Sequence, residues 1–364
     1  MRAPAELVSH VFRNPESIKG FSMGDWDKLV RQGRQANLLA RLHALLIQAK
    51  LDAAIPAAAR WHFEAATTLA ETHQGEMRRE LRRLRALLDG LGFPLVLLRG
   101  AAYVAANLPA SKGRLIEDID LLVPAERVVE VELALSQAEW QRVGLPEYDR
   151  RYYQRWKYVA PQLQHLRRAT VINLHHAIVP NSARYRPDAQ MLRRRATEIP
   201  RLAGLTVLSS EDRILHAATL LFHDDGLARG LRDLSDLDLL LRHAASESDF
   251  WPRLLARADE MELVRPLFYV LRYAQHFFAT PVPDEARDHL RSAAPGSATL
   301  KLMDGIYTRM LAPAHRSCTD AFMQPARAAT YLRTHWLRRP PRQLVPHLVY
   351  KAFIGPYQRE PNPA

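Results

Sequence analysis

Two aspartates in one short apolar segment are the side chains of this chain best suited to chemistry. The segment runs from Asp118 to Val123 (DIDLLV), and its apolar, β-branched character predicts a strand. Side chains alternate along a strand, so Asp118 and Asp120 share one face while Ile119 and Leu121 occupy the other. Two carboxylates held side by side repel each other unless a cation lies between them. The pair therefore predicts a site for hard divalent ions, Mg²⁺ or Mn²⁺, held against a triphosphate.

A strand-to-helix turn upstream supplies groups suited to binding phosphate. Residues 94–98 (PLVLL) predict a buried strand, and a helical pattern begins after Arg99 and Gly100. A glycine lets the backbone approach a phosphate closely, and the free N–H groups of a helix N-terminus attract anions. Gly100 and the next N–H, that of Ala101, are therefore predicted to cradle phosphates, while Arg99 and Arg114 offset the negative charge.

A second aspartate run, DLDLLL at 236–241, is similar in letters but differs in context. The surrounding leucines follow a helical spacing, so Asp236 and Asp238 point in different directions. Asp236 is predicted to anchor its helix.

The periodicity around these residues predicts an α+β fold with helical regions on both sides of a mixed sheet. Helices are expected up to Gly90 and Gly92, and again after Pro200. Between them, strands and helices alternate and end in two strands joined by a turn near Gln162. The predicted regions are an N-terminal helical region (1–90), an α/β core (91–200), a C-terminal helical domain (201–335) and a basic, proline-rich tail (336–364).

Composition limits the class of protein. Of 364 residues, 48% are hydrophobic and 25% are charged, which predicts a globular chain with a large core and excludes a disordered tail protein. The single cysteine, Cys318, excludes an intrachain disulfide and a zinc site built from cysteines. No apolar run long enough for a transmembrane segment occurs, and the N-terminus has no secretory h-region. A cytoplasmic location is expected.

The net charge of +12 favours anionic partners. The 44 arginines are spread along the chain, which argues against a dedicated nucleic-acid-binding stripe. Arg338, Arg339 and Arg342 surround two prolines in the tail. That tail is expected to be solvated and to dock on the helical domain, with an acidic partner or a membrane surface as the alternative.

The arrangement of strand, glycine, helix and Asp-x-Asp resembles the nucleotidyltransferase (DNA polymerase β-like) superfamily. The longer string resembles one bacterial branch, in which a Lys-Gly pair and an arginine precede the aspartates. In that branch a histidine, an acidic residue before Leu/Ile-His-Trp, and an Arg-Leu-x-x-Leu-x-Asp helix follow. The resemblance covers about residues 30–280, and the matching positions are Arg99-Gly100, Arg114, Asp118, Asp120, His165, Asn173 to His176, and Leu231 to Asp236.

The resemblance implies a Mg²⁺-dependent enzyme that transfers a nucleoside monophosphate from an NTP, with ATP expected, and releases pyrophosphate. The acceptor would be a small molecule, a peptide or a protein. Asp118, Asp120 and Asn173 would be the catalytic residues, with the two aspartates as metal ligands. His165 and His175 would contact the nucleotide.

Three positions depart from the family pattern. Arg99 replaces a lysine, which changes the donor geometry, and His176 replaces a tryptophan. Asn173 replaces the third carboxylate, and an amide ligates Mg²⁺ weakly and has no useful basicity. Glu117 is one candidate for a replacement acid. Two rival readings stay open: a degenerate nucleotidyltransferase that binds a nucleotide or a partner without turnover, and a basic nucleic-acid-binding module.

Overall fold

The computed structural model describes residues 5–143, 159–180, 183, 187–200, 202–223, 227 and 229–338. Two predicted segments lie mostly outside these residues: the strand expected just before Gln162, and the tail, which is described only as far as Arg338.

A mixed seven-stranded sheet forms the centre of the fold, with the strand order β3-β4-β5-β2-β1-β7-β6. Strand β1 pairs antiparallel with β2 and parallel with β7, and β2 pairs parallel with β5. The strands are β1 (Leu95–Leu98), β2 (Asp118–Leu122), β3 (Trp140–Arg142), β4 (Leu163–His165), β5 (Val171–His175), β6 (Thr197–Glu198) and β7 (Leu205–Val207). This sheet and the helices around it confirm the predicted α+β class.

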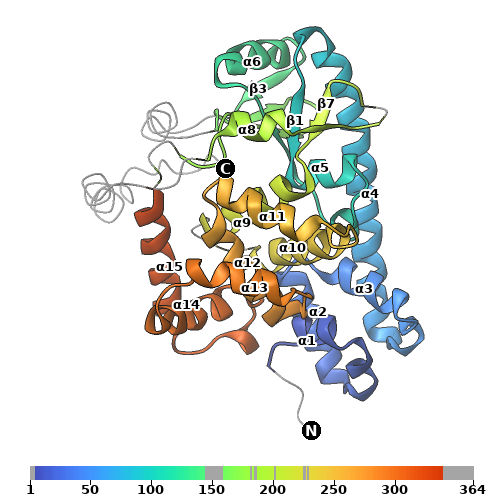
Figure 1. The fold of residues 1–364 in the computed structure, drawn as a ribbon. Helices are drawn as coiled ribbons and strands as arrows, with labels where there is room; N and C mark the ends of the chain where they lie inside the picture. The colour runs from blue at the N-terminus through green and yellow to red at the C-terminus, as the bar shows by residue number, and fades with distance from the viewer. Residues whose placement is uncertain are drawn as a thin grey trace, which may run out of the picture.

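Helices precede the sheet and lie within its connections. Helix α4 is the longest helix among the described residues, and Figure 1 shows it extending from the N-terminal helices up to the sheet. The N-terminal helices are α1 (Val8–Arg13), α2 (Met23–Gln35), α3 (Leu39–Gln48) and α4 (Ala57–Leu88), and those in the connections are α5 (Arg99–Ala105), α6 (Val128–Ser136) and α8 (Ala189–Arg194). The chain leaves α4 through Gly92, whose φ of +70° suits a glycine and agrees with the predicted helix end.

The chain after β7 is helical to the end of its described part. Ser209 caps the start of this region, because its Oγ accepts a hydrogen bond from the N–H of Asp212 at 3.2 Å. The helices are α9 (Ser210–His223), α10 (Gly230–Ala244), α11 (Phe250–Glu260), α12 (Val264–Phe278), α13 (Asp284–Leu290), α14 (Ser297–Met310) and α15 (Met323–Arg338). Asp236 and Asp238 lie within α10, which confirms that this run is not a strand. No helix in the described residues is long and apolar enough to cross a membrane.

The sheet differs from the prediction in two places. The turn expected near Gln162 instead follows β4 at residues 166–168, and Gln162 directly precedes that strand. The sheet also continues past residue 200, because β7 pairs with β1 through Leu205 to Val207. Strands of three residues, such as β4 and β7, are too short to show a period in the sequence. One continuous cluster of buried apolar residues joins the N-terminal helices, the sheet and the C-terminal helices.

The loop before β2 is held closely against α3. The side chain of Arg41 donates hydrogen bonds to the carbonyl groups of Ala110 at 2.7 Å and Lys112 at 3.2 Å. At Gly113 the backbone has a φ of +63°, and a Cβ there would lie 2.6 Å from the backbone nitrogen of Arg41. Only glycine fits both the conformation and the space.

Gly113→Ala is therefore expected to destabilise the protein by about 2–4 kcal/mol, through backbone strain and the clash with α3. Urea denaturation measures this free energy of unfolding. Gly20→Ala is the matched control, because a Cβ at Gly20 meets no heavy atom within 4 Å, and it should change stability by less than about 0.5 kcal/mol. Equal stabilities for the two variants would contradict the tight approach.

Candidate functional site

The sheet brings the three predicted catalytic residues together. In the parallel pairing of β2 with β5, Asp120 lies opposite Asn173. The amide nitrogen of Asn173 donates hydrogen bonds to Asp118 Oδ2 at 3.0 Å and to Asp120 Oδ1 at 2.9 Å. Asp118 and Asp120 share one face of the strand as predicted, and a single neutral NH₂ group bridges their carboxylates.

Gln162 determines how the Asn173 amide is oriented. Its Nε2 donates a hydrogen bond to Asn173 Oδ1 at 3.1 Å, so the oxygen of Asn173 faces Gln162 and the nitrogen faces the aspartates. Gln162 was expected only to mark a turn, because its place beside Asn173 depends on the antiparallel pairing of β4 with β5.

Two further groups contact Asp120. His175 Nε2 lies 3.0 Å from Asp120 Oδ1, and Arg99 Nη1 lies 3.5 Å from Asp120 Oδ2. Burial raises the pKa of Asp120, but the hydrogen bond from His175 and the charge of Arg99 outweigh burial and hold the pKa well below its usual range. Arg99 is at the turn from β1 into α5 with a φ of +49°, an unfavourable conformation for a residue other than glycine. The strained turn and the ion pair with Asp120 occur at the same residue.

Asp118 has the opposite electrostatic environment. Burial and the neighbouring negative charge of Asp120 raise its pKa above the usual value, more than Arg99 lowers it. The protein therefore stabilises the ionised form of Asp120, whereas ionising Asp118 in the folded state costs free energy.

The C-terminal helices cover this face of the sheet with charged and polar groups that the sequence analysis did not identify. His216 of α9 is buried, and burial together with the charges of His175 and Arg99 lowers its pKa to about 3. Burial lowers the pKa of Arg99, but the charges of Asp120 and of Asp233 in α10 outweigh it and raise that pKa. His216 lies in none of the motifs named above, and Asp233 lies within the Leu231 to Asp236 match but had no role assigned to it, because the closeness of both residues to the site depends on how α9 and α10 pack.

The predicted phosphate-binding turn is buried. Gly100 and Ala101 are inaccessible, and a Cβ on Gly100 would lie 3.2 Å from Arg114 Nε. Arg114 Nη1 pairs with Asp236 Oδ2 at 3.0 Å and lies 3.7 Å from Asp233 Oδ1. Arg114 therefore has carboxylate partners within the protein, and Asp236 anchors its helix as predicted. Contact of Gly100, Ala101 and Arg114 with phosphate stays a prediction.

Two predicted placements require correction. His165 does not join the Asp118 and Asp120 site, because Leu163 pairs with Ile172, and alternation then puts His165 on the opposite face of the sheet from Asn173. Glu117, the candidate replacement acid, instead pairs with Arg229 at 2.6 Å on the surface.

Asp118 and Asp120 are the side chains at this site that could ligate a divalent ion, Mg²⁺ or Mn²⁺. In the described part of the chain, no three His, Cys, Asp or Glu side chains converge in a way that could hold a metal. Asp118 and Asp120 supply two carboxylates, which suits a Mg²⁺ ion that also takes oxygen ligands from substrate phosphates. Asn173 turns an N–H donor toward them and therefore supplies no third ligand in this arrangement.

Comparison with known proteins gives one match. A family model described as "Uncharacterised nucleotidyltransferase" matches residues 22–279, which is well over half of the chain. No curated protein and no solved structure matches the chain.

Asp118→Asn is expected to stabilise the metal-free protein at neutral pH. Because the pKa of Asp118 is raised in the folded state, ionising this carboxyl costs folding free energy, and a neutral amide avoids that cost. The gain should shrink as the pH falls through the raised pKa and vanish only well below the unfolded value of about 4, where the carboxyl is protonated in both the folded and the unfolded state. Thermal unfolding in EDTA across this pH range measures it.

Asp120→Asn is the matched comparison and should behave in the opposite way. The pKa of Asp120 is lowered on folding, so its ionised form stabilises the protein above the unfolded pKa of about 4. The variant should lose about 1–3 kcal/mol at neutral pH. A loss of stability in both variants would contradict the assignment of opposite environments.

Proposed function

We propose that this chain, which belongs to the family of uncharacterised nucleotidyltransferases, transfers a nucleoside monophosphate from an NTP to an acceptor and releases pyrophosphate. The observation that carries the proposal is the pair Asp118 and Asp120, held on one strand face and joined through Asn173. The same two carboxylates are the only protein ligands that the proposed metal needs when a triphosphate completes its shell.

Asp118 and Asp120 would hold Mg²⁺ in this reaction. When bound, Mg²⁺ would neutralise triphosphate charge and polarise the reacting phosphoryl group. Arg99, whose guanidinium lies 3.5 Å from Asp120 Oδ2, would add positive charge beside the phosphates. His175 would hold the Asp120 carboxylate in position through its Nε2.

The transfer forms a bond between an acceptor oxygen and the α-phosphorus and breaks the bond to the bridging oxygen of pyrophosphate. That oxygen leaves with the electron pair, and the proton of the acceptor passes to solvent water. Asn173 cannot take this proton, because a neutral amide is not a useful base. The proposed acceptors are a small molecule, a peptide or a protein side chain, and ATP is the proposed nucleotide.

A second candidate is a nucleotide-binding protein without turnover, and the Asn173 contacts favour it. In the structure an N–H donor occupies the position between the two carboxylates, where a third acid would otherwise extend the metal site. Binding of a nucleotide through Asp118 and Asp120 does not require that acid, whereas activation of the acceptor does.

Asp118→Asn and Asp120→Asn are each expected to weaken Mg²⁺-dependent ATP binding by about 10- to 100-fold, as the loss of a charged ligand would. Calorimetric titration with and without Mg²⁺ measures the effect. Asp284→Asn removes an exposed carboxylate far from any ligand set described above and should bind as the parent does. If both site variants bind MgATP as tightly as the parent, the site assignment is wrong.

Asn173→Asp is expected to raise turnover with little change in ATP affinity. A general base contributes about 10²–10⁴-fold to a rate, which sets the scale of the gain. Pyrophosphate release with candidate acceptors, or labelling of the protein itself, measures turnover. Asn173→Ala removes the amide without adding an acid and should give no gain. Fast turnover by the parent that Asn173→Asp slows would exclude the non-catalytic candidate, whereas no turnover by either form would favour it.

A further inference from the structure

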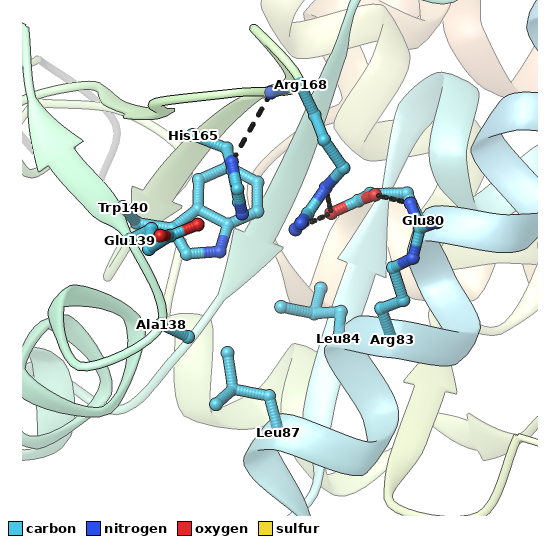
Figure 2. A pocket seen from close by; sticks show the side chains of 9 residues that line it. All are labelled: Glu80, Arg83, Leu84, Leu87, Ala138, Glu139, Trp140, His165 and Arg168. Carbon is cyan, nitrogen blue, oxygen red and sulfur yellow. Dashed lines mark hydrogen bonds and ion pairs between the residues drawn. The ribbon is translucent and has the colours of Figure 1, made fainter.

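The pocket between α4 and the β3–β4 edge of the sheet is balanced in charge (Figure 2). Glu80 pairs with Arg168 at 2.7 Å and with Arg83 at 3.0 Å, and Glu139 is the other carboxylate that lines the pocket. Two arginines and two glutamates cancel, so this pocket does not select a charged ligand. The excess positive charge of the chain lies elsewhere.

Most of the excess positive charge is concentrated near the C-terminal end of the sequence. Residues 297–364 contain ten lysines and arginines against three aspartates and glutamates. Less than a fifth of the chain therefore carries seven of its twelve net positive charges. This segment includes α14, α15 and the basic tail.

The positive charges of α14, α15 and the loop between them are not neutralised within the described protein. Asp304 pairs with Arg272 at 2.6 Å, and Asp320 pairs with Arg309 at 2.7 Å, so both carboxylates of this hairpin already have partners. The basic side chains of the hairpin that are exposed and form no ion pair with another described residue are Lys301, Arg316 and Arg327.

Helix α15 has one buried face and one exposed apolar face. Residues three and four apart lie on the same side of a helix. The set that packs on the protein is Met323, Ala326, Thr330, Thr334 and Leu337. A second set is exposed and entirely apolar, and it comprises Pro325, Ala328, Leu332 and Trp336. We call this second set the α15 stripe. Its two large side chains, Leu332 and Trp336, are 51% and 47% exposed.

Two further large apolar side chains are exposed on the same hairpin. Leu302 of α14 is 61% exposed, and Phe322, directly before α15, is 65% exposed. Figure 1 shows α14 and α15 at the edge of the molecule. The hairpin lies beyond residue 279, where the match to the family model ends, so its exposed face is not part of the region shared with the family. Apolar groups gathered on an exposed face mark an interaction surface.

The charge around the α15 stripe selects what can cover it. The tail beyond Arg338 contains four lysines and arginines against one glutamate, and a second copy of the chain would bring the same positive hairpin. Like charges therefore oppose both of these occupants. An anionic lipid bilayer fits the charge and the apolar groups together, because its headgroups attract lysine and arginine while its interface takes up tryptophan and leucine.

We propose that the α15 stripe docks the protein on an anionic membrane surface. The helix lies along the bilayer interface with Leu332 and Trp336 inserted among the headgroups. The unpaired basic side chains of the hairpin attract acidic lipids over distances of up to about 10 Å. The proposal rests on the charge and exposure of this hairpin and not on nucleotidyl transfer.

Sedimentation with lipid vesicles tests this proposal. The full chain should sediment with vesicles of phosphatidylglycerol and phosphatidylcholine and stay in the supernatant with phosphatidylcholine alone. High salt should weaken the binding, because it screens the attraction between the basic side chains and the headgroups. A chain that stays in the supernatant with both kinds of vesicle overturns the proposal.

The double variant Leu332→Gln/Trp336→Gln tests the stripe without a change of charge. It should bind the anionic vesicles about 10- to 100-fold more weakly than the parent, because two apolar side chains no longer enter the interface. Trp61→Gln is the matched control, because Trp61 of α4 is 57% exposed and lies outside the hairpin. It should bind as the parent does. Unchanged vesicle binding by a folded double variant overturns the proposal.

Arg327→Gln tests the charge and should weaken binding to the anionic vesicles about fivefold. Arg78→Gln is its control, because Arg78 of α4 is also exposed and forms no ion pair with a described residue. Equal binding by these two variants contradicts the role of Arg327. A dimer that Leu332→Gln/Trp336→Gln disrupts, or tight binding of single-stranded DNA, overturns the proposal if the parent does not bind vesicles.

Discussion

The Asp236 carboxylate is the point at which three parts of the chain meet. It pairs with Arg41 of α3 at 2.9 Å and with Arg114 of the loop before β2 at 3.0 Å, and all three side chains are buried. A buried carboxylate is costly unless it is paired, and removal of one partner leaves an uncompensated charge. The placement of α10 against both the N-terminal helices and the sheet therefore depends on this triad. Because Arg114 packs on Gly100, the turn that carries Arg99 depends on it as well.

The candidate site places three donors of the protein against two adjacent carboxylates. Repulsion between Asp118 and Asp120 suggests a cation from the sequence alone. The structure supplies the NH₂ group of Asn173, the Nε2 of His175 and the guanidinium of Arg99 beside them. These donors are distributed unevenly, so Asp120 receives most of them and Asp118 retains a raised pKa. An added cation would therefore stabilise the ionised form of Asp118 more than that of Asp120.

The parts of the site that the sequence predicts are those encoded within one strand. The alternation in DIDLLV places Asp118 and Asp120 on one face, and the same reasoning places Asn173 and His175 together on β5. The residues that other elements bring to the site could not be predicted from the sequence. The positions of Gln162, His216 and Asp233 relative to the aspartates depend on strand pairing or helix packing. His165 was misplaced for the same reason, because its face depends on the register of β4 against β5. Helix positions were predicted better than the short strands, since helices are long enough to show a period.

The long separation between Arg41 and its partners has a consequence for how the chain is made. Arg41 and Ser235, which also bond to each other, are 194 positions apart. A ribosome adds about 5–20 residues each second, so α10 follows α3 by on the order of 10–40 s. During that interval the nascent chain contains Arg41 without its carboxylate and the Asp118 and Asp120 strand without its covering helices. Completion of this part of the fold therefore waits for α10, and until then the strand that carries Asp118 and Asp120 lacks the helices that later pack beside it.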